Sequence, residues 1–113
     1  MARRVVRVYA KTADVMRALR DVATEKEGVI KYFNETEGRA ELHSGHSFST
    51  HEGQKIVVNV SASEDGSVME VQTSILRAWL GIIQVFDWGE GSRIARKVVA
   101  DTLSRLGLPE VRQ

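Results

Sequence analysis

Hydrophobic and polar residues alternate along four segments of the chain, which is the spacing of strands with one buried and one solvated face. The segments are Arg3–Lys11, Val29–Gly45, Lys55–Ser63 and Ser67–Leu76. The second holds two strands around a tight turn near Gly38, and Glu64–Gly66 predicts another turn between the last two. Such alternation favours an antiparallel sheet. The side chains expected to face the core are Val6, Val8, Ala10, Ile56, Val58, Val60, Met69, Val71 and Ile75.

Two further segments carry apolar residues three and four positions apart, which predicts helices. One helix is expected from Ala13 to about Lys26, with Thr12 capping its N-terminus. The other is expected to begin at a capping Ser92 and to end at Gly107. Its apolar stripe consists of Ile94, Val98, Val99, Leu103 and Leu106.

The predicted elements follow the order β-α-β-β-β-β-α, which indicates an α+β fold built on an antiparallel sheet of four to six strands. Both helices need a surface that buries their apolar stripes, and the buried face of the sheet is the one available. We therefore expect both helices to pack on one face of the sheet. The length of 113 residues suits a single domain over residues 1–113.

This element order resembles that of the TATA-binding-protein-like and helix-grip folds. In those folds a curved antiparallel sheet wraps around a long C-terminal helix. The resemblance covers most of the chain and rests on element order, because no residue motif of these families is matched. It implies an architecture and leaves the function open.

Composition narrows the classes of protein that remain. Hydrophobic residues make up 42% and charged residues 27%, which is typical of a globular chain. The absence of cysteine excludes disulfides, thiolate metal sites and cysteine nucleophiles, and suits a reducing compartment such as the cytoplasm. The longest apolar-rich run, Ala78–Phe86, is too short to span a bilayer, so we expect no membrane association.

Charge is distributed unevenly although the net charge is only +1. The first 20 residues carry six basic side chains and one acidic one, whereas residues 21–70 carry four basic and ten acidic ones. Segments of opposite sign can meet in the fold and neutralise each other. Arg93, Arg96 and Lys97 share one helix face and form a candidate site for an anion or a nucleic acid. The sequence disfavours nucleic acid as a partner, because the chain is only faintly basic and has 6% aromatic residues.

All three histidines lie between Leu42 and Gln54, in the sequence LHSGHSFSTHEGQ. A metal site needs ligands that converge, and Glu41 and His43 share one face of a strand, with His51 as a further candidate ligand. The spacing of the histidines matches no known metal motif. The serine, threonine and glycine around them are typical of a solvated hairpin loop, so we expect neither a metal nor a cofactor.

The segment Arg77–Arg93 alternates poorly and contains both tryptophans. Apolar residues occupy both strand faces here, which indicates burial on both sides by the core, by a partner chain or by a ligand. Aromatic residues are frequent in interface centres, so this segment is a candidate surface for self-association or for a small apolar ligand. The candidate residues are Trp79, Leu80, Ile82, Ile83, Phe86 and Trp88.

Two functions remain open. The first is a non-enzymatic binding or interaction domain, a homo-oligomer that associates through this apolar segment. The alternative is a small-ligand protein or minor enzyme with a helix-grip-like cavity, in which His43, His46 or His51 handles protons at the cavity mouth. No catalytic signature appears at a recognisable spacing, so the sequence favours a protein that is not an enzyme.

Overall fold

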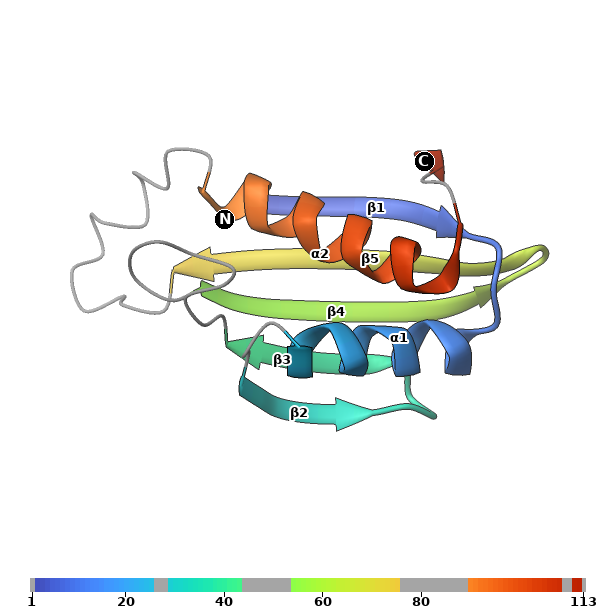
Figure 1. Cartoon of the computed structure of the whole chain (residues 1–113), viewed down its shortest axis with the longest axis horizontal. Coiled ribbons are helices and arrows are strands. Elements are labelled where there is room, and N and C mark those ends of the chain that lie inside the picture. The colour runs from blue at the N-terminus through green and yellow to red at the C-terminus, as the bar shows by residue number, and fades with distance from the viewer. Residues whose placement is uncertain (1, 26–28, 44–53, 76–89, 109–110, 113) are drawn as a thin grey trace.

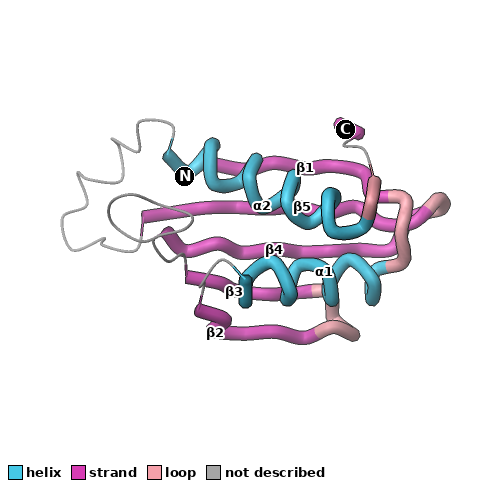
Figure 2. Tube along the Cα trace, in the orientation of Figure 1, coloured by secondary structure: helices cyan, strands magenta, loops and turns pink. Residues whose placement is uncertain are grey.

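The computed structural model describes residues 2–25, 29–43, 54–75, 90–108 and 111–112. They form two helices and six strands, the last of them only two residues long (Figures 1 and 2). In chain order the elements are β1 (Ala2–Val8), α1 (Thr12–Glu25), β2 (Val29–Asn34), β3 (Arg39–His43), β4 (Gln54–Ser63), β5 (Gly66–Ile75), α2 (Glu90–Leu106) and β6 (Val111–Arg112).

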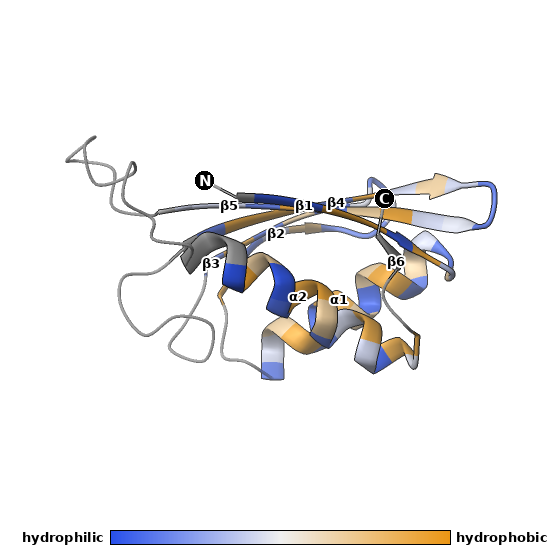
Figure 3. Cartoon of the chain, turned by 90° about the horizontal axis from the view of Figure 1, so that it is seen from above, coloured by the Kyte–Doolittle hydropathy of each residue, from blue (hydrophilic) through white to orange (hydrophobic). Residues whose placement is uncertain are grey.

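The strands form one antiparallel sheet in the order β2-β3-β4-β5-β1-β6. Both helices pack against the same face of this sheet, and no described element covers the other face (Figure 3). The predicted α+β fold with β-α-β-β-β-β-α order is therefore confirmed, with the short strand β6 as an addition. Because β1 inserts beside β5, the N-terminal strand becomes an interior strand of the sheet.

The core lies between the sheet and the two helices, where the alternation of the strands predicted it. On the central strand β4, Ile56 and Val58 are fully buried, whereas Asn59 between Val58 and Val60 is partly exposed. Ala10 packs partly buried against the core, and the side chain of Ile75 lies outside the described residues. The largest fully buried side chains are Met16, Leu19, Leu42, Ile56, Met69, Ile94 and Leu103.

The N-terminus of each helix differs from the sequence expectation. The amide of Val15 donates to the carbonyl oxygen of Lys11 at 3.0 Å, so the capping position is Lys11 and Thr12 is already helical. Helix α2 begins at Glu90, which places Ser92 inside its first turn rather than at the cap. A capping preference acts over one or two residues, so it locates a helix start only to that precision.

Helix α2 ends at Leu106, and Gly107 follows it, as predicted, in a Schellman motif. Gly107 has a φ of 72°, and its amide donates to the carbonyl oxygen of Ser104 at 3.0 Å. The amide of Leu108 donates to the carbonyl oxygen of Leu103 at 2.9 Å, and Leu108 packs against the core. Glycine suits this position because the left-handed conformation costs it little.

Opposite charges from distant segments meet in the fold, as the uneven charge distribution led us to consider. Arg17 of α1 lies 3.1 Å from Glu35, which follows β2. Arg105 near the end of α2 pairs with Glu25 and lies 3.7 Å from Asp21, both on α1. The hydrogen bond from Arg105 to Glu25, followed by the charge of Glu25, raises the pKa of Arg105. The Arg105 pairs link the two helices at the molecular surface, and the Arg17–Glu35 pair links α1 to the turn after β2.

Candidate functional site: the uncovered face of the sheet

The uncovered face of the sheet carries valine, polar and charged side chains across its strands. The strand registers align its outward residues in rows across β3, β4, β5 and β1. One row contains Glu41, Val57, Gln72 and Arg3, and the next contains Arg39, Asn59, Glu70 and Val5. Beyond the second row, Val68 faces Arg7. The face is therefore a mixture of valine, polar and charged side chains.

A cluster of three titratable side chains lies at the β3 side of this face. Glu41 Oε2 lies 3.4 Å from His43 Nε2, and Glu41 Oε1 lies 3.8 Å from Lys55 Nζ. His43 and Lys55 occupy paired positions on β3 and β4. The Glu41 carboxylate thus lies between two basic side chains. All three side chains are partly exposed, between about a quarter and a half of their surface.

Two of the candidate metal ligands belong to this cluster. Glu41 and His43 do share a face and lie in contact, whereas His51 and His46 lie outside the described residues. Within the described ranges, no group of three or more metal-ligating side chains converges. The ammonium of Lys55 beside Glu41 would also repel a divalent cation.

At the β1 side, Glu70 is engaged through both carboxylate oxygens. Arg3 Nε donates to Glu70 Oε2 at 2.5 Å, and Gln72 Nε2 donates to Glu70 Oε1 at 3.3 Å. Arg39 and Arg7 are exposed cations of the same face, and neither has an ion pair or hydrogen bond to any described side chain. Sequence reasoning did not single out Arg39, Glu70 or Gln72, although their outward positions follow from the alternation.

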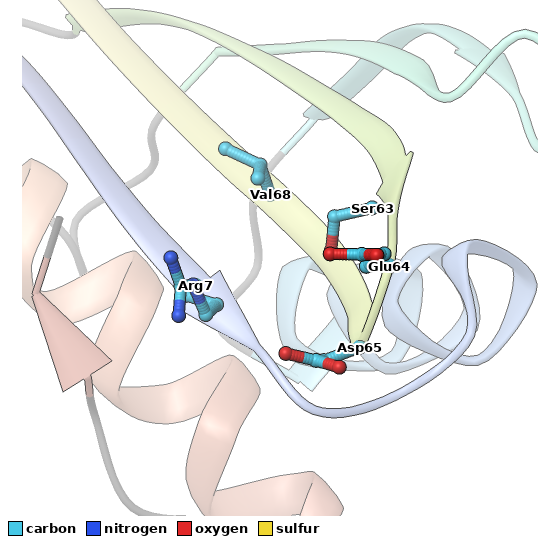
Figure 4. A pocket seen from close by; sticks show the side chains of 5 residues that line it. All are labelled: Arg7, Ser63, Glu64, Asp65 and Val68. Atoms are coloured by element: carbon cyan, nitrogen blue, oxygen red, sulfur yellow. The ribbon is translucent and has the colours of Figure 1, made fainter.

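Surface depressions occur beside the β4–β5 hairpin and between the helices. The first measures about 250 Å³ and is lined by Arg7 and Val68 of the uncovered face and by Ser63, Glu64 and Asp65 of the hairpin (Figure 4). Two others flank Arg105 in the groove between α1 and α2. All three are open to solvent and largely lined by charged side chains, so none is an apolar pocket of the expected helix-grip kind.

The remaining predicted residues lie elsewhere. Arg93 and Arg96 are exposed on α2, and Lys97 lies 3.6 Å from Asp101 on the same helix. Since α2 covers the opposite face of the sheet, this trio is separated from the uncovered face. The apolar candidates fall at positions outside the described residues; they are Trp79, Leu80, Ile82, Ile83, Phe86 and Trp88.

No protein-family model and no curated protein matches this chain. Within the described ranges, neither helix has the length and apolar composition that crossing a membrane requires.

Proposed function

We propose that this chain is a non-enzymatic interaction domain of the cytoplasm that associates with copies of itself through the apolar segment from Trp79 to Trp88. The observation that carries the proposal is the composition of that segment. Its apolar side chains occupy both strand parities, and two of them are tryptophans. Large aromatic side chains dominate the energetics of protein interfaces because they bury much area at little entropic cost.

The described core supports this proposal. The sheet and the two helices bury their apolar stripes against one another in a single cluster. Among the described residues, the large hydrophobic side chains that remain exposed are Tyr9, Val29 and Tyr32. The apolar residues between β5 and α2 therefore come in addition to helices and strands that already have a core of their own.

The surface depressions give little support to the alternative of a ligand-binding protein or minor enzyme. The element order is compatible with the resemblance to TATA-binding-protein-like and helix-grip folds, which we keep as an architectural proposal. The described depressions are shallow and charged, and the Glu41–His43–Lys55 cluster has no neighbouring apolar cavity among them. No specific observation favours the second function.

The test is the oligomeric state of charged variants. Trp79→Glu and Ile82→Asp are expected to convert a self-associated protein into a folded species of lower mass, measured by native mass spectrometry and sedimentation velocity. Burying a carboxylate in an apolar contact is costly enough to separate the copies. Circular dichroism and a thermal melt of each variant report whether the fold persists.

Ala100→Glu is the matched control, because Ala100 is an apolar residue that is exposed on α2, on the helix side of the molecule. This variant is expected to keep the mass of the unaltered protein. The proposal is wrong if the unaltered protein is a monomer. It is also wrong if Trp79→Glu and Ile82→Asp unfold the chain, since their side chains would then belong to the core.

A further inference from the structure

The uncovered face combines short side chains and charged side chains in a way that suits contact with another sheet. Its two central strands carry the short side chains of Val57, Asn59 and Val68. They also carry Glu70 and Gln72, with Lys55 at one end of β4. The long cationic side chains of Arg39, Arg3 and Arg7 lie on the flanking strands β3 and β1. The short side chains let a second sheet approach, while the charged side chains around them fix its register.

Charges on this face alternate in sign along β3. Arg39 and Glu41 are two residues apart on the same strand, and both point to the uncovered side. Consider a second copy laid face to face, related by a two-fold axis that runs across the strands between these residues. The axis exchanges the two positions, so Arg39 of each copy lies opposite Glu41 of the other.

The central strand β5 satisfies the same two-fold axis. Gln72 and Glu70 are also two residues apart, one in the row of Glu41 and the other in the row of Arg39. The axis therefore places the amide donor of Gln72 opposite the carboxylate acceptor of Glu70. On β4, between these two strands, Val57 of one copy lies opposite Asn59 of the other. No charge in these two rows lies opposite a like charge.

The spacing of packed sheets agrees with these pairs. Face-to-face sheets lie about 10 Å apart, a distance that an arginine and a glutamate side chain bridge together. Arg39 is exposed and has no acceptor within the described part of its own chain, so it is available for such a pair without breaking an existing one.

We propose that the uncovered face of the sheet is an isologous dimer interface, in which Arg39 of each copy pairs with Glu41 of the other. This surface is separate from the apolar segment of the proposed function. If both surfaces are used and their two-fold axes intersect at right angles, the chain forms a closed tetramer.

The experiment is a charge exchange followed by sedimentation velocity and native mass spectrometry. Arg39→Glu places two carboxylates against each other twice per dimer, and is expected to raise the dissociation constant at least about tenfold. The double variant Arg39→Glu/Glu41→Arg restores opposite charges with reversed polarity. It is expected to return the dissociation constant to within about threefold of the original, because the pair is re-formed.

Arg96→Glu makes the same change on α2, where Arg96 is exposed on the helix side of the molecule, and is expected to leave the dissociation constant unchanged. A monomeric unaltered protein, an Arg39→Glu variant that associates normally, or a double variant that stays dissociated would each overturn the interface. Thermal melts of all three variants report whether the sheet persists.

The two proposals fail separately. Loss of association in Trp79→Glu but not in Arg39→Glu supports the apolar segment alone and overturns the sheet interface. The reverse result supports the sheet interface and overturns the proposed function. A tetramer that each change reduces to a dimer supports both.

Discussion

Gly38 lies directly against the backbone of Val60, 22 positions later in the chain: a β-carbon on Gly38 would lie 2.1 Å from the carbonyl oxygen of Val60. The amide of Val60 also donates to the carbonyl oxygen of Gly38 at 2.6 Å. Gly38 has a φ of 77°, in the left-handed region. The turn between β2 and β3 is thus fastened to the central strand β4 at a point that only glycine fits.

Gly38→Ala is therefore expected to lower the free energy of unfolding by about 2 kcal/mol or more, because the left-handed strain adds to a backbone clash. Chemical denaturation at one protein concentration measures the change. Gly107→Ala is the control, since Gly107 has a φ of 72° but no atom within 4 Å of the point where a β-carbon would lie. Its cost should be about 1 kcal/mol, and equal costs at both positions would contradict the close approach.

Thr73 and Ser67 both carry buried hydroxyls on β5. We expect removal of the two hydroxyls to change the free energy of unfolding in opposite directions. Thr73 is 1% exposed, and its hydroxyl has no hydrogen-bond partner among the described residues. Thr73→Val keeps the shape and removes an unsatisfied group, so we expect it to raise the free energy of unfolding by about 1 kcal/mol. Valine also suits a strand.

Ser67 is fully buried, and its hydroxyl donates to the carbonyl oxygen of Ala10 at 2.6 Å. Ser67→Ala removes this hydrogen bond to the main chain, which should lower the free energy of unfolding by about 1 kcal/mol or more. Thermal melts of the two variants side by side measure the signs. A destabilised Thr73→Val would indicate that its hydroxyl has an acceptor.

Leu42 and Val29 lie on opposite faces of the β2–β3 pair, so their substitutions should differ in cost. Leu42 is 1% exposed in the core, so Leu42→Ala should cost about 2–5 kcal/mol of unfolding free energy through lost burial and a cavity. Val29 is 52% exposed, and Val29→Ala should cost less than about 1 kcal/mol. Equal effects in urea denaturation would mean that Val29 is covered in solution.

Added zinc is expected to leave the melting temperature of the tag-free protein unchanged. Glu41 and His43 provide only two converging ligands among the described residues, and Lys55 stands beside them. A metal that binds only the folded state would raise the melting temperature by mass action. A rise that zinc produces in the unaltered protein but not in His43→Ala would instead establish a metal site that includes His43.

The sequence determined which side chains face the core and which face outward. Strand alternation has a period of two residues, so neighbours such as Val58 and Asn59 are assigned to opposite faces without knowledge of any partner strand. The apolar stripe of α2 and the left-handed glycine at Gly107 are equally local. These rules fixed the α+β order and the packing of both helices on one face.

The tertiary structure alone decided which distant residues meet. The placement of β1 beside β5 brings Arg3 to Glu70, and no local pattern specifies this pairing because strand order depends on the whole sheet. The approach of Gly38 to Val60 and the alignment of Arg39 with Asn59 arise in the same way. Local spacing selects the face of a residue, whereas the free energy of the assembled core selects its neighbours.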